Sequence, residues 1–464
     1  MFKLENATIS DMQRAVEAGE LTYKELTLMY MEQIAAKDSC ENGLNSVAEL
    51  NPDALTGASI WDDNQEIRGP LYGISVLLKD NIATKDAMRT TAGSLALMEN
   101  YASQDATIVT ALRESGAIIL GKTNMTEFAN WMTDNMPNGY SSRSGRVKNP
   151  HNPEADPYGS STGSAVAVAA NLCAASIGTE THGSIIAPAF ANGVVGIKPT
   201  AGLFSTMGIV PISYTLDTPG PMARTVYDAA LILGALRPHY SNTKKIDYTG
   251  GLNEAKLQGL RIGIYNKAGK DEEYNKILNT ALRALEEGGA VLIHDLPLAV
   301  EGSPWQHIGT TIAHHEFRNA INQYLSGVDN FVNSNLKVKN LADIIEFNRQ
   351  NPDSCLKYGQ TTLEKCQAYS DNLTAPEYIE ALRRRQNACN ALDAIFDNNN
   401  LDVIICANEF DGIAPITGFP SGTIPIGRRE NNVPAGMYFM ARRNDETTLI
   451  RAMHACEQAV GRKP

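Results

Sequence analysis

Residues 158–200 contain the feature that most restricts the fold of this chain. Two loops rich in serine, threonine and glycine, GSSTGS at residues 159–164 and TETHGS at residues 179–184, flank an apolar, alanine-rich stretch. An ordinary turn needs only one or two glycines. Two such loops this close together predict backbone amides and hydroxyls that converge on one small site. The alternative is two tight turns around a buried helix and strand.

Short apolar runs alternate with amphipathic segments along most of the chain. Strands are predicted at residues 71–78, 117–120, 173–177, 194–197, 261–265, 291–295 and 403–406. Helices are predicted at residues 8–38, 106–115, 164–172, 274–288, 378–396 and 446–460. This alternation indicates an α/β protein with a largely buried sheet. Residues 301–400 are more polar and mostly helical in pattern, which predicts a helical insertion that shapes the substrate pocket.

The charge balance and the cysteine pattern exclude several classes of function. Lysine and arginine number 40 against 52 aspartate and glutamate residues, a net charge of −12, which disfavours nucleic-acid and membrane partners. We expect no signal peptide and no membrane span, because no apolar stretch is long enough. Seven widely spaced cysteines without a CxxC motif argue against a disulfide framework and a zinc site, and favour the cytoplasm.

The adjacent histidines His314 and His315 are a possible metal-binding feature. Neighbouring residues in a helix point in different directions, so two consecutive histidines are poorly placed to bind one ion. We therefore expect this pair to lie at the surface and not to bind a metal.

Lys79 ends a predicted buried strand and is a candidate general base. It follows the strand residues 74–78. Burial disfavours the charged ammonium group and lowers its pKa, and a neutral lysine can accept a proton. Asp80 comes next, but in a strand it points to the opposite face. The alternative is a lysine that emerges into solvent where the strand ends.

Ser184 closes the second loop and is a candidate nucleophile. Consecutive backbone amides in such a turn can form a nest for an anion. A nest beside a serine suits acyl transfer, because the hydroxyl attacks while the amides hold the oxyanion that develops. A serine also needs an activating base. No His/Asp pair is evident from the spacing, whereas Lys79 and Ser160 are available.

Three separated segments together resemble the amidase signature family. They are Lys79, the loop YGSSTGSAVAVAA and the run GTETHGSIIAPAFANGVVGIKPT. The similarity extends to GELTYKEL near the N-terminus, GKTNMTEFA at residues 121–129, DTPGPMARTVYDAA at residues 217–230 and FPSGTIPIG near the C-terminus, and is weakest between residues 240 and 400. It implies a single α/β/α domain over residues 1–464, with a mixed, largely buried central sheet.

The resemblance also implies a mechanism and a set of site residues. It indicates an amide hydrolase that acts through a serine acyl-enzyme, with no metal or organic cofactor, on a small-molecule or peptide amide. The implied residues are Ser184 as nucleophile, Ser160 as bridging serine after a cis Gly159–Ser160 bond, Lys79 as base, the backbone N–H groups of Thr181, His182, Gly183 and Ser184 as oxyanion hole, and Ser161 and Thr123 as supporting groups.

Two departures from the family pattern bear on the substrate. The common pattern around the nucleophile is close to TDTGGSIR, whereas this chain has TETHGSII at residues 179–186. The chain is more similar to a branch with GTETDGSI, which includes bacterial peptide amidases that remove the C-terminal carboxamide of peptides. His182 replaces the aspartate of that branch, and Ile186 replaces the usual arginine.

Four other functions remain as alternatives. The run from Gly159 to Gly163 also satisfies G-x-S-x-G, the nucleophile elbow of α/β-hydrolases, with Ser161 as nucleophile. That motif needs a preceding apolar strand, and residues 148–158 are polar and rich in proline. The chain could also be the ammonia-generating subunit of a tRNA-dependent amidotransferase, a hydrolase of small aryl or aliphatic amides, or a binding protein with a relic site.

Overall fold

A computed structural model gives the fold. It describes residues 2–63, 69–238, 246–265, 271–294, 296, 298, 305–327, 331–333, 335–369, 373–406 and 412–461. None of the helices within these residues is both long and apolar enough to cross a membrane. All seven cysteines are free, and six of them are buried.

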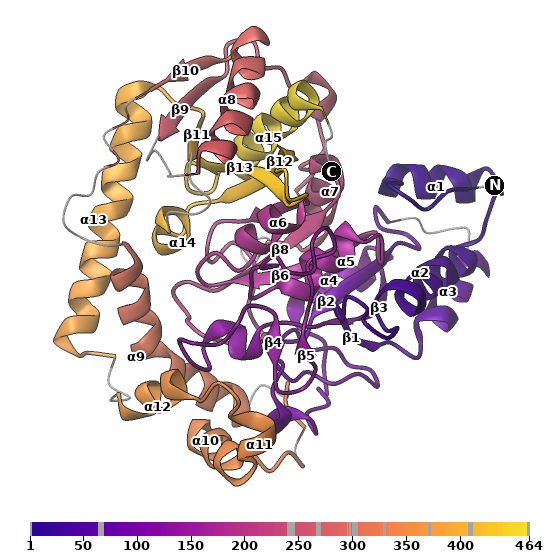
Figure 1. The fold of residues 1–464 in the computed structure, drawn as a ribbon, viewed down its shortest axis with the longest axis vertical. Coiled ribbons are helices and arrows are strands. Elements are labelled where there is room, and N and C mark those ends of the chain that lie inside the picture. The colour runs from indigo at the N-terminus through magenta and orange to yellow at the C-terminus, as the bar shows by residue number, and fades with distance from the viewer. Residues whose placement is uncertain are drawn as a thin grey trace.

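A mixed sheet of eleven strands runs through the molecule (Figure 1). Its strands, in order across the sheet, are β1 (Val47–Leu50), β3 (Ile118–Thr123), β2 (Ser75–Lys79), β6 (Ala175–Glu180), β8 (Thr218–Ala223), β7 (Val195–Lys198), β12 (Ser421–Arg428), β13 (Pro434–Ala441), β11 (Val403–Cys406), β9 (Arg261–Tyr265) and β10 (Val291–Ile293). Strands β4 (Tyr140–Ser141) and β5 (Gly145–Arg146) form a separate small ribbon. Strand β2 is parallel to both of its neighbours, and the strands from β6 to β11 pair antiparallel.

Fifteen helices lie in the described residues. They are α1 (Ile9–Glu17), α2 (Tyr23–Lys37), α3 (Ala54–Asp63), α4 (Thr107–Glu114), α5 (Thr162–Ala169), α6 (Ile186–Asn192), α7 (Val226–Ala235), α8 (Glu272–Glu287), α9 (Trp305–Leu325), α10 (Leu341–Gln350), α11 (Pro352–Cys355), α12 (Thr361–Ala368), α13 (Pro376–Asn399), α14 (Ile413–Thr417) and α15 (Glu446–Val460). Short 3₁₀ turns are η1 (Leu95–Leu97), η2 (Glu127–Asn130) and η3 (Leu252–Glu254).

Helices cover both faces of the sheet, and two glycines explain how closely they approach. A Cβ at Gly422 of β12 would collide with Met453 of α15, whereas a Cβ at Gly436 of β13 would lie 2.6 Å from the ring of Phe190 in α6. In the β12–β13 register, Gly422 is opposite Phe439 and Gly436 is opposite Pro425. Because side chains alternate between the two faces of a sheet, these glycines point to opposite faces. Helices α15 and α6 therefore lie on opposite sides, in three α/β/α layers.

The predicted fold class is confirmed, and most predicted elements are present. The strand at residues 261–265, the strand at 403–406 and the helix at 446–460 match β9, β11 and α15. The strand predicted at residues 71–78 is shorter than expected, because only Ser75–Lys79 is extended. Residue 295, the end of the strand predicted at 291–295, lies outside the described residues.

Most of the described part of residues 301–400 is helical, as predicted. It contains α9 to α13, and α9 packs against α12, α13 and α14. Figure 1 shows α9 and α13 along one flank of the molecule, with α10 to α12 below them. Residues 301–304, the start of the predicted insertion, lie outside the described residues.

The prediction that His314 and His315 lie at the surface is wrong. They are 6% and 2% exposed. They are buried because α9 packs against other segments. His314 contacts Trp131, which follows η2, and His315 contacts Tyr378 of α13. Tyr369 lies against both rings.

Candidate active site

Lys79 lies at the end of β2, in the interior of the sheet. The side chain is fully buried. Its Nζ donates hydrogen bonds to Ser160 Oγ at 2.8 Å, to the carbonyl oxygen of Thr179 at 3.1 Å and to Thr179 Oγ1 at 3.0 Å. All three acceptors are uncharged, so no carboxylate is bonded directly to the amine. The parallel neighbours β3 and β6 hold the strand that carries it.

This burial changes the protonation of Lys79. Burial lowers the pKa of the amine from 10.5 to about 7, and the carboxylates of Asp217 and Glu180 offset part of that effect. A substantial fraction of the amine is therefore neutral at neutral pH and able to accept a proton. Asp80 takes no part, because its carboxylate bonds Arg143 and Thr91 on the other side of the strand.

The first serine-rich loop lies against the second. The Gly159–Ser160 peptide bond is cis, as the family resemblance implies. The Ser160 side chain is fully buried with its Oγ on Lys79. The N–H of Ser161 donates to the carbonyl oxygen of Ser184 at 3.2 Å. The structure thus brings Lys79 and Ser160 together and sets the adjoining residue, Ser161, on the backbone of Ser184.

Ser184 lies in the turn between β6 and α6. Gly183 has φ = +83°, a left-handed conformation that favours glycine and explains its place before the serine. Among the described residues, no acceptor lies within hydrogen-bond distance of the N–H groups of Gly183 and Ser184. Ser184 is 6% exposed and lines a cavity together with Thr181 and His182. A reacting carbonyl in this cavity can therefore meet both the hydroxyl and unpaired backbone donors.

Two carboxylates hold this turn, the buried Glu180 and the half-buried Asp217. Glu180 accepts hydrogen bonds from the N–H groups of Ile185 at 2.7 Å and Ile186 at 3.0 Å. Asp217 accepts one from Thr181 Oγ1 at 2.6 Å, and burial raises the pKa of Asp217 to about 6. Sequence reasoning missed both residues, although Glu180 lies within the loop that it singled out.

We expect Glu180→Ala to lower the free energy of unfolding by about 3 kcal/mol, because two buried N–H groups lose a charged acceptor. We also expect kcat to fall more than KM rises, since the turn that carries Ser184 loosens. Urea unfolding and steady-state kinetics measure the two effects. Glu180→Gln, which keeps an acceptor oxygen, is the matched control and should lose less. An alanine variant as stable and active as the parent would contradict this role.

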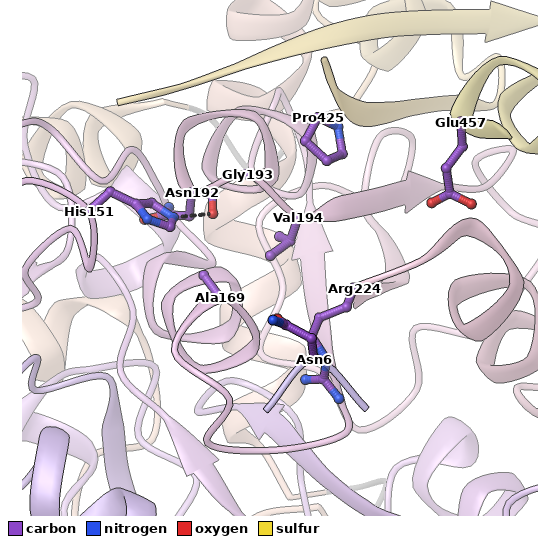
Figure 2. Close-up of a pocket in the computed structure, with 9 residues that line it drawn as sticks. All are labelled: Asn6, His151, Ala169, Asn192, Gly193, Val194, Arg224, Pro425 and Glu457. Atoms are coloured by element: carbon purple, nitrogen blue, oxygen red, sulfur yellow. Dashed lines mark hydrogen bonds between the residues drawn. The ribbon is translucent and has the colours of Figure 1, made fainter. Parts of the chain in front are cut away.

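The cavity beside Ser184 has a volume of about 240 Å³. Its lining consists of Ala129, Asn130, Trp131, Thr181, His182, Ser184, Ile212, Leu216, Gly309, Thr310 and Ala313. Four segments contribute: η2 with the residue after it, the turn before α6, the loop before β8, and α9 of the helical region. A second cavity lies at the other end of α6, where His151 bonds the carbonyl oxygen of Asn192 at 2.9 Å (Figure 2). At about 50 Å³ it is much smaller, and it contains none of the predicted site residues.

Ser161 and Thr123 both lie beside the predicted triad. Ser161 Oγ donates to the carbonyl oxygen of Thr179 at 3.0 Å and accepts from the N–H of Thr179 at 3.2 Å. Thr123 pairs with Lys79 across β2 and β3, but its hydroxyl bonds Ser164, not the lysine. Sequence reasoning missed Thr179, which contacts Lys79 directly, and Asn81, whose Nδ2 donates to Thr179 Oγ1 at 2.9 Å.

The chain has relatives along its whole length. Residues 25–412 match the model of the Amidase family. A probable amidase from Arabidopsis thaliana is 36% identical over 100% of this chain and 92% of its own. The native peptide amidase from Stenotrophomonas maltophilia is 36% identical, with a TM-score of 0.92 over 100% of this chain and 99% of its own. A glutamyl-tRNA(Gln) amidotransferase subunit from Thermosynechococcus vestitus is 31% identical over 97% of this chain and 98% of its own.

Proposed function

Because the chain belongs to the amidase family and is an amide hydrolase, we propose that it cleaves carboxamides through an acyl-enzyme on Ser184. The observation that carries the proposal is the 2.8 Å contact between Lys79 Nζ and Ser160 Oγ. A buried lysine with a pKa of about 7 is a competent base, and its partner loop adjoins the turn of Ser184.

The proposed reaction starts with proton transfer along the two serines. Neutral Lys79 takes the proton of Ser160, and Ser160 takes that of Ser184. Ser184 Oγ attacks the amide carbonyl, and the backbone N–H groups of residues 181–184 hold the resulting oxyanion. The tetrahedral intermediate collapses as the relay returns the proton to the leaving nitrogen, which departs as ammonia or an amine. Water then attacks the acyl-enzyme by the same route and releases the carboxylic acid. No metal or organic cofactor takes part.

We propose the C-terminal carboxamide of a peptide as the substrate. Full-length similarity to a peptide amidase supports this choice. The similarity to an amidotransferase subunit supports a second candidate, in which the chain supplies ammonia to a partner. The helical region at residues 301–400 is proposed to shape the pocket within a single domain, because α9 contributes Gly309, Thr310 and Ala313 to its lining. Seven free cysteines support a cytoplasmic location.

An ammonia-release assay on the purified chain tests this function. The panel contains amidated peptides, simple aliphatic and aryl carboxamides, and glutamine, with Ser184→Ala as the blank. We expect rapid release from the terminal carboxamide of peptides, with mass spectrometry showing the free acid. Release from glutamine alone, and only with added partner subunits, would favour the amidotransferase role. Turnover of small aryl amides alone would contradict the peptide substrate.

A further inference from the structure

The cavity beside Ser184 carries no charged side chain among its described lining residues. Two carboxylates, Asp217 and Glu316, adjoin that lining. Glu316 is buried and Asp217 is half-buried, and both are already hydrogen-bonded, Asp217 to the N–H groups of Ile212 and Ser213, and Glu316 to Thr215 and Tyr378. The walls combine apolar side chains with hydroxyls, one amide and the rings of Trp131 and His182. A charged ligand group in this cavity would lose its water and find no counter-ion.

His182 is the titratable side chain in the described lining, and two glycines set its position. A Cβ at Gly412 would lie 2.9 Å from His182 Nε2, and one at Gly309 would lie 3.8 Å from His182 Cδ2. The ring is therefore held against the backbones of α9 and the start of α14. Burial lowers the pKa of His182 to about 4, so the ring is neutral at pH 7.

We infer that this cavity receives an uncharged group attached next to the reacting carbonyl, and that the His182 side chain sets this charge preference. The inference rests on the proposed function and narrows its substrate class. In a peptide amide, the group in question is the side chain of the C-terminal residue. The cavity, at about 240 Å³, is smaller than the roughly 300–1,000 Å³ of typical ligand pockets, which fits one side chain but not several.

Matched pairs of N-acetylated amino-acid amides test the preference at pH 8. Norleucinamide and lysinamide differ mainly by a terminal ammonium group. The γ-methyl ester of glutamic acid α-amide and the free acid differ by a carboxylate. We expect kcat/KM to be at least about tenfold higher for the neutral member of each pair, because the charged member must be desolvated without a partner. Equal kcat/KM within both pairs would overturn the inference.

Substitutions at His182 test its part in the selection. His182→Asp should shift the lysinamide to norleucinamide ratio of kcat/KM by at least about tenfold toward lysinamide, since a carboxylate supplies the missing counter-ion. His182→Asn should leave that ratio within about twofold of the parent. The matched control is His151→Asp, which places the same charge near the far end of α6. A ratio that shifts equally in the asparagine variant, or does not shift in the aspartate variant, would refute the role of His182.

Binding to Ser184→Ala separates this inference from the proposed function. Isothermal titration calorimetry measures the affinity of the same amides for a protein that cannot acylate at this position. Tighter binding of the neutral members supports the inference even if the unmodified chain releases no ammonia, a result that would contradict the proposed function alone. Equal binding of charged and neutral members contradicts the inference even if hydrolysis is rapid.

Discussion

Replacing Ser184 with alanine is expected to lower kcat/KM for amide hydrolysis by at least about 10⁴-fold, because the nucleophile of the proposed acyl-enzyme is lost. Ser184 combines the features that this role needs. Its side chain lines the cavity, and it follows a glycine whose left-handed backbone exposes two N–H groups without acceptors among the described residues. The variant should fold normally, since a serine that is only 6% exposed is replaced by a smaller residue.

Ser161→Ala is the comparison that makes this result specific. Ser161 is fully buried, and its hydroxyl is already engaged by both backbone groups of Thr179. Loss of these two hydrogen bonds should reduce kcat/KM on the order of tenfold, through the position of Thr179 and Lys79. Under the nucleophile-elbow alternative the two effects would be reversed. The structure argues against that alternative, because no strand lies between Val147 and Ser161, all of which are described.

Active-site labelling provides the second measurement for Ser184. A fluorophosphonate should form one adduct, which peptide mass spectrometry assigns to Ser184. The alanine variant should show none. An adduct on Ser161, or more than a tenth of the parental activity in Ser184→Ala, would exclude Ser184 as the nucleophile. Absence of any serine adduct in the parent would leave the chain as a binding protein with a relic site.

The predictable part of the fold consists of strands with a clear apolar pattern. β9 (RIGIY) and β11 (VIIC) are short, mainly apolar runs between polar segments, and their bounds follow from the sequence. β12 and β13 were not predicted, because glycine and proline interrupt both of them. Contacts in the tertiary structure explain why glycine and proline occur in these two strands. Gly422 makes room for α15, Gly436 makes room for α6, and Pro425 lies at an irregularity in the β12–β13 register.

The candidate site also has a part that could be predicted from the sequence and a part that could not. A lysine at the end of an apolar strand and two loops rich in small residues are local patterns, so the positions of Lys79 and of the two loops could be predicted. The contact of Lys79 with Thr179 depends on how β2 and β6 align. The burial of His314 depends on Trp131, and that of His315 on Tyr378 of α13, both far from the pair in sequence. No local pattern contains that information.

Replacing Lys79 with methionine is expected to lower kcat by at least about 10³-fold, since the relay loses its base while the buried volume is kept. The pH dependence should change with it. Because the folded pKa of Lys79 is about 7, the rate of the parent should fall about tenfold per pH unit below pH 7 and level off above pH 8. The residual rate of Lys79→Met should not show this fall in rate, here called the step near pH 7.

Lys79→Met should change stability in the opposite direction to activity. The pKa of Lys79 is lowered from 10.5 to about 7 on folding, so between these values the unfolded chain binds a proton that the folded chain does not. The free energy of unfolding therefore rises with pH across this window, and is lowest below pH 7. Lys79→Met removes that slope, and should unfold at an equal or higher urea concentration than the parent at pH 7. A loss of activity without a loss of stability in Lys79→Met would indicate that Lys79 has a catalytic role and not a structural one.

Lys122→Met is the control for this experiment. Lys122 is also fully buried, on the neighbouring strand β3, and burial lowers its pKa to about 8. Its Nζ donates to the carbonyl oxygen of Ile82 at 2.5 Å and to Thr90 Oγ1 at 3.1 Å, and contacts no residue of the proposed relay. The Lys122 variant should keep the step near pH 7 and most of kcat. If both variants lose activity equally, or if Lys79→Met retains the step, the base must be a group other than Lys79.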